Sequence, residues 1–567
     1  FFPIVFMEGM TGRLFREFSI VISGSVIISS FAALTFTPML ATKLLVKREK
    51  QNWFYLKTEP FFEGMNRLYS RSLAVFLHKR WIALPFVAIT IGIIAFLWNY
   101  IPAEMAPLED RSQISINTRG AEGVTYEYIR DYTEDINDLV DSIVPDAESV
   151  TARVSSGSGN VRITLKDMKD RDYTQMDVAE KLSAAVQKKT MARSFVQQSS
   201  SFGGRRGGMP VQYVLQATNI EKLQEVLPKF MAKVYENPVF QMADVDLKFS
   251  KPEARININR DKASIMGVST RNIAQTLQYG LSGQRMGYFY MNGKQYEILG
   301  EINRQQRNTP ANLKSIYIRS DKGDMVQLDN LIELTGGIAP PKLYRYNRFV
   351  SATVSAGLAE GKTIGQGLDE MDKIAKETLD DTFRTALTGD SKEYRESSSS
   401  LMFAFILAIV LIYLILAAQF ESFKDPLIIM LTVPLAIAGA LVFMYFGGIT
   451  MNIFSQIGII MLIGLVAKNG ILIVEFANLK QETGEDKMTA IKDAALQRLR
   501  PILMTSASTI LGLIPLAFAS GEGCNQRIAM GTAVVGGMLV STLLTMYIVP
   551  AIYSYISTNR SNKLKQE

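Results

Sequence analysis

The stretch IGLVAKNGILIVEFA (residues 463–477) places one lysine, Lys468, inside an apolar run that extends from Ile457 to Phe476. A charged side chain within a membrane-crossing helix is costly and usually serves function. The only acidic residue of the same helix, Glu475, lies seven positions further on, which is about 10 Å along a helix axis. Lys468 therefore needs a carboxylate from another membrane segment. No Asp or Glu lies deep in the other apolar segments of this chain.

Seven apolar stretches are long enough to cross a hydrocarbon core about 30 Å thick. They cover residues 18–42, 81–101, 400–418, 426–447, 452–477, 502–519 and 529–556. Of the 567 residues, 48% are hydrophobic and 20% are charged, with a mean hydropathy of +0.11. Phe1 to Met7 resemble the end of an eighth stretch. The composition therefore predicts a polytopic α-helical membrane bundle.

Basic residues concentrate in residues 43–80, in residues 478–500 and in the tail 557–567. By the positive-inside rule these three regions lie in the cytoplasm, and residues 102–399 lie outside it. Residues 46–80 have apolar side chains at helical spacing, which predicts an amphipathic linker helix on the inner membrane surface. The alternative is a packed cytoplasmic linker helix without lipid contact.

The large outer region, residues 112–390, alternates short β-rich runs with amphipathic helices and predicts an α+β domain. A first unit in the order β-α-β-β-α-β, a split βαβ sandwich, is predicted from 113–118, 125–143, 148–154, 161–166, 174–188 and 192–198. A second unit is predicted from 210–216, 219–235, 253–259, 349–355, 363–379 and 383–388. Residues 260–343 form an insertion between its two parts.

Two stretches are rich in Gly. SSGSGN (155–160) lies within the first unit, and SSSFGGRRGG (199–208) follows its last predicted strand. Neither matches a phosphate loop or a dinucleotide-binding fingerprint, so ATP-driven and Rossmann-type functions are not expected. One interpretation is two flexible surface loops. The other is that they move with substrate and contact it, with apolar and cationic side chains. The candidate contact residues are Ser155, Gly157, Phe195, Phe202, Arg205 and Arg206.

The beginning of the chain also resembles its end when the sequence is shifted by a constant 512 residues. The shift aligns Pro3, Phe6, Gly9, Gly24, Ser29 and Pro38 with Pro515, Phe518, Gly521, Gly536, Ser541 and Pro550. Matched Pro and Gly positions are informative because they constrain the backbone. A parallel repeat of transporter halves explains the match. We therefore expect this chain to be a second half, with residues 1–45 as the end of the first.

A carboxylate that exchanges Lys468 for a proton changes the charge of the low-dielectric interior, and so can couple proton flow to helix movement. We therefore predict that Lys468 belongs to a proton relay. Asn469, Thr505 and Arg498 are the other candidates, with Arg498 at the cytoplasmic end of its helix. A lysine that extends to the membrane interface is the structural alternative.

Five motifs stand out along the chain: TGRLFREFS (11–19), TFTPMLATKLL (35–45), the run ending in LED at Asp110, AKNGILIVEFA (467–477) and RLRPILMTS (498–506). Together they resemble the resistance-nodulation-division (RND) exporters, in particular their hydrophobe/amphiphile branch, which includes bacterial multidrug efflux pumps. The motifs span nearly the whole chain, and the last two are highly specific.

This resemblance implies a twelve-helix homotrimer in the bacterial inner membrane that exchanges protons for exported amphiphiles, without a cofactor. It also implies a periplasmic adaptor protein and an outer-membrane channel as partners. Lys468 corresponds to the relay lysine, Thr505 to the relay threonine and Arg498 to the arginine at the cytoplasmic end. The relay aspartates belong to the other half of such proteins. By resemblance, the chain divides into a membrane helix (81–104), porter subdomains (105–206, and 207–256 with 345–390), a docking subdomain (257–344) and further membrane helices (400–556).

The chain departs from the well-known drug pumps where their pocket is aromatic. The stretch SSGSGN is short and lacks phenylalanine, and Thr151 and Arg162 stand where pocket phenylalanines are expected. Phe195 does match an aromatic residue of the substrate-access pocket. The resemblance therefore supports substrate capture more strongly than an aromatic drug pocket.

Other functions fit the sequence less well. A copper or silver exporter is the nearest alternative because the chain has 26 Met, whose thioethers bind soft metals. A lipid or metabolite exporter, and a non-transporting receptor or protein-translocation subunit, are further alternatives. An enzyme is not expected, because no nucleophile–base pair is recognisable. One His and one Cys argue against a His/Cys metal site, and nothing in the sequence indicates nucleic-acid binding.

Overall fold

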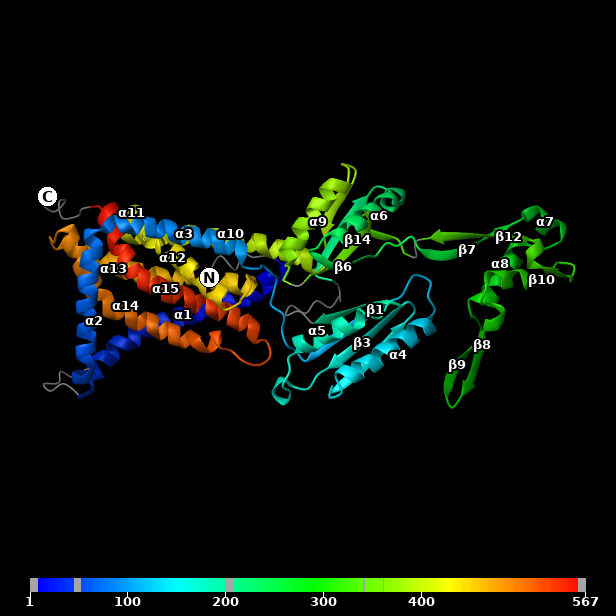
Figure 1. The fold of residues 1–567 in the computed structure, drawn as a ribbon, viewed down its shortest axis with the longest axis horizontal. Helices are drawn as coiled ribbons and strands as arrows, with labels where there is room; N and C mark the ends of the chain where they lie inside the picture. Colours follow the sequence, from blue (N-terminus) through cyan, green and yellow to red (C-terminus); the bar gives the residue numbers. More distant parts are fainter. Residues whose placement is uncertain (1–8, 45–52, 199–208, 340–341, 360, 559–567) are drawn as a thin grey trace.

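The computed structural model describes residues 9–44, 53–198, 209–339, 342–359 and 361–558. Figure 1 shows an elongated molecule with long helices at one end, two α+β units in the middle and a separate lobe at the far end. The long helices follow from the apolar stretches, and the α+β units follow from the alternating segments of residues 112–390.

Seven helical spans among the described residues are long and apolar enough to cross a membrane. They are formed by α1 (Gly9–Leu44), α3 (Ala83–Tyr100), α10 (Gly389–Phe420), α11 (Lys424–Met430) with α12 (Thr432–Phe446), α13 (Ile453–Glu482), α14 (Lys487–Ala517) and α15 (Cys524–Ile556). The seven apolar stretches predicted from the sequence fall on these spans. Helix α10 begins directly after the outer region, so one continuous helix joins that region to the membrane.

Helix α15 lies at the centre of the bundle and packs against α12, α13 and α14. Glycines allow this close approach. A Cβ atom on Gly537 would lie 2.3 Å from Leu462 Cδ1 and 2.8 Å from the Ala436 carbonyl oxygen, and one on Gly536 would lie 2.4 Å from Phe443 Cβ. Small residues at helix contacts are typical of membrane bundles, where backbones must approach closely to pack.

Helix α2 (Trp53–His78) crosses the ends of the membrane helices that lie away from the α+β units (Figure 1). Tyr69 and Leu73 are buried, and the Tyr69 hydroxyl donates a hydrogen bond of 2.6 Å to the Met546 carbonyl oxygen of α15. Phe61 and Leu68 remain exposed. One face of α2 therefore packs against the membrane helices, as expected for a packed linker helix. The exposed apolar residues on α2 are those that contact with a membrane surface would require.

The first α+β unit contains β1 (Gln113–Arg119), α4 (Tyr126–Ile143), β2 (Ser149–Ser155), β3 (Ser158–Thr164), α5 (Gln175–Val186) and β4 (Arg193–Gln198). Its strands form an antiparallel sheet in the order β2-β3-β1-β4. Ile114 and Ile116 of β1 pack against Tyr132 and Ile136 of α4. The two helices therefore cover one face of the sheet and leave the other face open.

The second unit repeats this topology with β5 (Val211–Ala217), α6 (Ile220–Glu236), β6 (Phe240–Val245), β14 (Phe349–Leu358), α9 (Ile364–Thr378) and β15 (Arg384–Leu387). Its strand order is β6-β14-β5-β15, and the short β13 (Tyr344–Tyr346) also pairs with β14. Phe240 and Ala243 place β6 in the core. The second strand of this unit is thus β6, which the sequence analysis did not identify.

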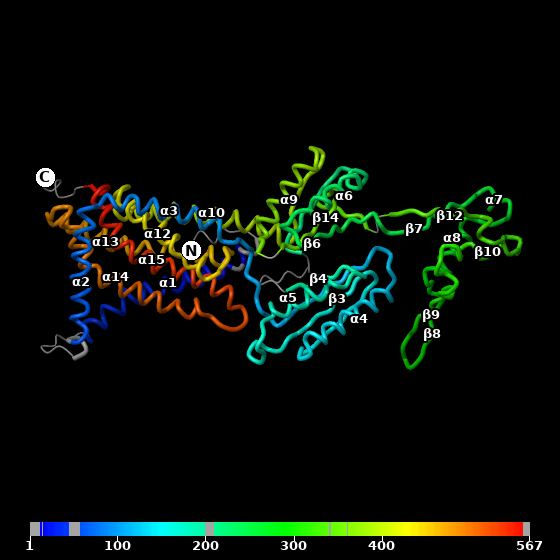
Figure 2. The backbone as a smooth tube through the Cα atoms, in the orientation of Figure 1, coloured from blue at the N-terminus to red at the C-terminus, as the bar shows by residue number. Residues whose placement is uncertain are grey.

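The prediction that residues 253–259 belong to the second unit is wrong. These residues lie in β7 (Lys251–Ile258), which pairs instead with β12 (Ile332–Ala339) from Lys251↔Ala339 to Ile258↔Ile332. Figure 2 shows the pair as a ribbon that leads to the far lobe. The alternating pattern did predict a strand, but alternation does not identify its partner.

The far lobe contains α7 (Arg260–Ile265), α8 (Thr270–Leu281), β8 (Gln284–Met291), β9 (Lys294–Gly300), β10 (Tyr317–Arg319) and β11 (Met325–Gln327). The lobe also contains short 3-10 helices at Arg304–Gln306, Pro310–Ser315 and Leu328–Asn330. Two further 3-10 helices, Arg80–Ile82 and Met168–Asp170, lie outside the lobe. Ile273, Ile318 and Leu328 form the centre of the lobe's own small core. Strands β8 and β9 form a hairpin that projects from the lobe (Figure 2).

The close contact at Gly537 leads to a testable prediction. Gly537→Ala should destabilise the protein by about 1–3 kcal/mol because the added methyl overpacks the contact with α12 and α13. The expected result is a lower midpoint of thermal unfolding for the detergent-solubilised protein. Gly464→Ala on α13 is the control, since a Cβ atom there meets nothing within 4 Å. An equal effect of both substitutions would contradict the packing argument.

Candidate functional site

A polar layer surrounds Lys468 near the middle of α13. Lys468 is half-buried and has no hydrogen bond or ion pair to any residue that the structure describes. The next residue, Asn469, is fully buried. Its Nδ2 atom donates to Ser506 Oγ of α14 at 3.3 Å and to Thr542 Oγ1 of α15 at 3.4 Å. Three membrane helices therefore meet at this layer through polar side chains.

Thr505 lies within about 3 Å of the depth of Lys468, because each directly precedes a residue of the Asn469–Ser506 contact on helices that run in opposite directions. Its exposed hydroxyl donates to the Ile502 carbonyl oxygen at 3.2 Å. Both side chains thus lie at the border of the α13–α14 contact, where a further polar group can reach them.

Arg498 lies outside this layer, seven residues before Thr505 and therefore about 10 Å nearer the N-terminal end of α14. Its guanidinium carbon is 4.6 Å from the centre of the Phe476 ring, a cation–π distance. The Arg498 Nε atom is buried without a hydrogen-bond partner within the described part of the chain. Of the four relay residues predicted from the sequence, the structure brings three to one depth and places Arg498 at another.

The sequence analysis did not name Ser506 or Thr542, which complete the layer. A signal for them exists, because hydroxyl residues recur on one face of α15 at positions 541, 542 and 545. Ser541 and Thr545 are fully buried, with their hydroxyl oxygens 3.4 Å apart. In an apolar helix, such residues are expected to face other helices rather than lipid.

A second buried polar network lies at the N-terminal end of α11 and the C-terminal ends of α13 and α15. Asp425 is fully buried, and its Oδ2 atom accepts from Asn478 Nδ2 at 3.2 Å. Tyr553 donates to Asn478 Oδ1 at 2.5 Å and accepts from Gln481 Nε2 at 2.7 Å. Asn478 lies ten residues, about 15 Å, beyond Lys468 on α13. Asp425 is therefore too far away to be the missing partner of Lys468.

The segment from Ile101 to Ser112, here named the connector, joins the membrane bundle to the first α+β unit. Glu109 Oε1 accepts a hydrogen bond of 3.0 Å from the Gln526 backbone N–H in the first turn of α15. Asp110 Oδ2 accepts one of 2.8 Å from the Gln175 backbone N–H, the first residue of α5. Two adjacent carboxylates thus cap two helices, one in the membrane and one outside it. Carboxylates are stabilising at helix N-termini because free N–H groups and the positive end of the helix dipole lie there.

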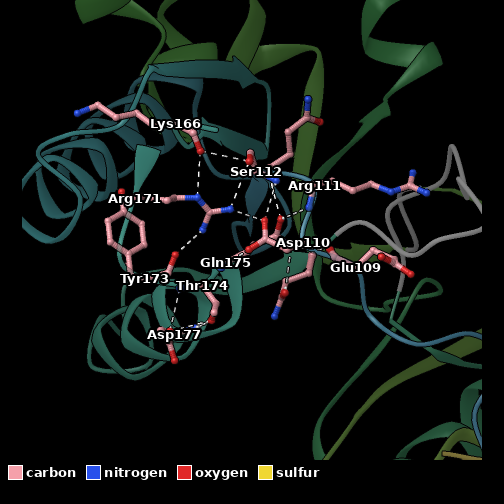
Figure 3. Close-up of polar contacts among 12 residues, drawn as sticks. Glu109, Asp110, Arg111, Ser112, Lys166, Arg171, Tyr173, Thr174, Gln175 and Asp177 are labelled. Carbon is pink, nitrogen blue, oxygen red and sulfur yellow. Dashed lines mark hydrogen bonds and ion pairs between the residues drawn. The ribbon is translucent and has the colours of Figure 1, made fainter. Parts of the chain in front are cut away.

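Figure 3 shows the outer part of this junction. Arg171, whose side chain is fully buried, forms an ion pair with Asp110 and donates to the Tyr173 and Lys166 carbonyl oxygens. Burial by itself raises the pKa of Asp110. The hydrogen bonds from the Gln175 N–H, Arg171 and the Ser112 N–H outweigh it, so the pKa lies below its usual value. Asp110 therefore remains a carboxylate at neutral pH.

The connector also contacts the loop between α12 and α13. The backbone N–H of Met451 donates to the Pro102 carbonyl oxygen at 2.8 Å, and the N–H of Glu104 donates to the Met451 carbonyl oxygen at 3.0 Å. The Thr450 hydroxyl donates to the Glu104 carboxylate. Burial raises the pKa of Glu104 despite this bond. The connector is thus hydrogen-bonded both to the loop that precedes α13 and to the first turn of α15.

The predicted substrate-contact residues lie in three places. Thr151, Arg162 and Phe195 lie on the open face of the first sheet, as their pairing registers show. Ser155 and Gly157 lie at the tight turn between β2 and β3, where Gly157 adopts a φ of +79°. The stretch SSGSGN therefore forms the tight turn of the β2–β3 hairpin and the strand ends beside it. The remaining three, Phe202, Arg205 and Arg206, lie outside the described residues.

Within the described ranges, no group of three or more His, Cys, Asp or Glu side chains is placed to hold a metal ion. The arrangement that the structure does provide is a lysine in a polar layer of the membrane bundle, linked through α15 and the connector to an outer α+β region. This combination is that of a membrane transporter.

Comparison with known proteins agrees with this class. The sequence profile of the AcrB/AcrD/AcrF family of RND permeases matches residues 1–557, and the chain belongs to this family. The chain is also 30% identical over 568 residues to an uncharacterized transporter of Haemophilus influenzae, covering 98% of this chain and 55% of that protein. The chain thus spans about half the length of this curated relative.

The buried ion pair at the connector leads to a second prediction. Asp110→Asn should destabilise the protein by about 3 kcal/mol, because Arg171 keeps a buried charge without its carboxylate. Thermal unfolding at pH 7 measures this. Since the pKa of Asp110 is lowered, its stabilisation is present above the ordinary aspartate pKa of about 4 and is lost as the pH falls below that value.

The matched control for this substitution is Asp135→Asn, an exposed aspartate on α4. This change removes the same charge from the unit next to the connector and should alter stability by about 0.5 kcal/mol or less. If Asp110→Asn and Asp135→Asn unfold at the same temperature, the ion pair does not hold the junction together.

Proposed function

We propose that this chain forms part of a proton-driven exporter and that Lys468 is its relay lysine. The observation that carries the proposal is the position of Lys468 beside the Asn469–Ser506–Thr542 contact, with no carboxylate paired to it among the described residues. An ammonium group inside a bilayer needs a counter-charge. The relative of nearly twice the length supports a partner carboxylate in a further part of the protein.

The physical basis of coupling is a competition for that carboxylate. While the carboxylate is charged, Lys468 pairs with it and holds the helix that bears it against α13. When a proton neutralises the carboxylate, the attraction between it and Lys468 is lost, and the hydrogen bonds of the polar layer rearrange. Thr505 and Asn469 supply hydrogen-bonding groups at the same depth. Asn469 Oδ1, which is buried without a partner in the described chain, is available to accept a bond in one of the two states.

The whole protein would then export amphiphilic compounds in the manner of the hydrophobe/amphiphile RND branch. We propose a homotrimer in the inner membrane of a two-membrane bacterium, with the α+β units in the periplasm as porter subdomains. The far lobe would dock with an outer-membrane channel, and an adaptor protein would complete the complex. Family membership and the seven apolar spans support this assignment.

The test is export by the full-length protein in bacterial cells that lack their own exporters. Lys468→Ala should reduce proton-dependent export of an amphiphilic dye at least about tenfold. Without the lysine, protonation of the relay carboxylate no longer breaks an ion pair with α13. Accumulation of the dye is measured with and without a protonophore.

Lys480→Ala is the matched control because it removes a lysine from the same helix, outside the apolar run. Lys480 forms a partly exposed ion pair with Glu485 at 2.6 Å, and such pairs contribute little. Normal export by Lys468→Ala at a normal membrane level would sink the relay assignment. Absence of export by the wild type would instead contradict the exporter function.

A further inference from the structure

The open face of the first sheet has an unusual charge composition. Its side chains include four arginines, Arg119, Arg153, Arg162 and Arg193, and no carboxylate from any of the four strands. The other side chains on this face are Gln113, Ser115, Asn117, Ser149, Thr151, Ser155, Ser158, Asn160, Thr164, Phe195 and Gln197. The face is therefore cationic and polar, with a single aromatic ring.

Two of the four arginines already have a partner. Arg119 and Arg193 lie 3.4 Å and 3.3 Å from the carboxylate of Asp244 on β6, which Lys248 also contacts at 2.9 Å. Three cations thus share one carboxylate at this end of the face. That carboxylate leaves no spare negative charge for the arginines further along the sheet.

Arg153 and Arg162 are exposed and have no hydrogen bond or ion pair to any described residue. Arg162 of β3 is opposite Thr151, and Arg153 of β2 is opposite Asn160. The two arginines are therefore diagonal neighbours, with Cβ atoms about 7–8 Å apart. At this spacing both guanidinium groups can reach the same anionic group. Guanidinium binds sulfate, phosphate and carboxylate oxygens through paired hydrogen bonds.

Next to the arginines, a row of amides crosses three strands. Asn160 Nδ2 donates to Asn117 Oδ1 at 2.8 Å, and Asn117 Nδ2 donates to Gln197 Oε1 at 2.9 Å. This chain of bonds uses the Gln197 oxygen as an acceptor, so its Nε2 hydrogens point to other groups. The Gln197 amide thus offers hydrogen-bond donors on the Phe195 side of the face, while Asn160 Oδ1 remains an acceptor on the arginine side.

Phe195 lies at the opposite side of the same face, on β4. It is two strand spacings across the sheet and two residues along it from Arg162, which is about 12 Å between Cα atoms. A ligand that contacts both residues must therefore carry its charge about 12 Å from an apolar part. This separation corresponds to an amphiphile with an alkyl or aromatic tail rather than to a free inorganic anion.

We propose that this face binds anionic amphiphiles, with a sulfate, phosphate or carboxylate head between Arg153 and Arg162 and the tail toward Phe195. The proposal rests on the proposed export function and specifies its substrate class. A cationic amphiphile meets four arginines and a lysine against one aspartate. A neutral one leaves two arginine charges without compensation once water is excluded. Charge complementarity thus selects the anion.

The test compares three compounds with the same ten-carbon tail and different heads: decyl sulfate, decyl maltoside and decyltrimethylammonium. Binding of each radiolabelled compound to the full-length protein in lipid nanodiscs is measured against empty nanodiscs. The wild type should prefer decyl sulfate. Replacing both arginines by glutamine (R153Q with R162Q) should weaken decyl sulfate binding at least about tenfold, which corresponds to about 1.4 kcal/mol for lost charge-assisted hydrogen bonds. Binding of decyl maltoside should change less than about twofold.

Arg162→Glu should weaken decyl sulfate binding further than the double variant does, because it places a carboxylate beside Arg153 that repels the anionic head. The matched control is Arg130→Gln on α4, because Arg130 is an exposed arginine of the same unit, on the helix that covers the other face of the sheet. This change should leave all three affinities unaltered. The head-group preference thus separates binding from a general effect on folding.

Two results would overturn the proposal. One is equal wild-type binding of the three compounds. The other is an equal loss for all three in the double variant, or a lower thermal stability with unchanged head-group preference, since the arginines would then pair with carboxylates elsewhere in the protein. Export of the same compounds from cells tests the proposed function separately. Selective binding without export contradicts export alone, and export without head-group preference contradicts only this inference.

Discussion

The close approach of α15 to its neighbours is the constraint on which the membrane part depends. Helices in lipid gain no hydrophobic free energy by contacting one another, so their association depends on dispersion contacts and interhelical hydrogen bonds. Gly536 and Gly537 bring the α15 backbone against α12 and α13. Only at that distance can Thr542 accept a hydrogen bond from Asn469. The packing of small residues therefore places the polar layer beside Lys468.

The same helix also links this layer to the outer region. Its first turn is bonded to Glu109, and Thr542 lies sixteen residues further on, which is about 24 Å along the axis. Because Asp110 follows Glu109 and caps α5, the connector has no free residue between its membrane contact and its contact with the first α+β unit. A displacement of α15 along its axis thus has a direct covalent and hydrogen-bonded route to the sheet that carries Arg153 and Arg162.

Much of this architecture could be predicted from the sequence, and the failures have physical causes. Apolar runs identified the seven spans because lipid demands long apolar helices. Alternation identified most strands, but it could not show that β7 leaves the second unit to pair with β12, since pairing is decided by tertiary contacts. Lys468 was identifiable by its cost in an apolar segment. Ser506 and Thr542 were missed because hydroxyl residues are common in membrane helices, and their importance depends on which helix they face.

The position of α15 in the chain has a consequence for how the protein is made. A ribosome delivers the chain from its N-terminus, so α15, the last described helix, enters the membrane after α12, α13 and α14. Until then those helices lack the surface against which they pack, and Asn469 lacks one of its two hydroxyl partners. The packing of α12, α13 and α14 against α15 therefore forms only after α15 has been synthesised. A chain shortened within α15 would leave the earlier helices without the close glycine contacts and the hydroxyl partner that α15 supplies.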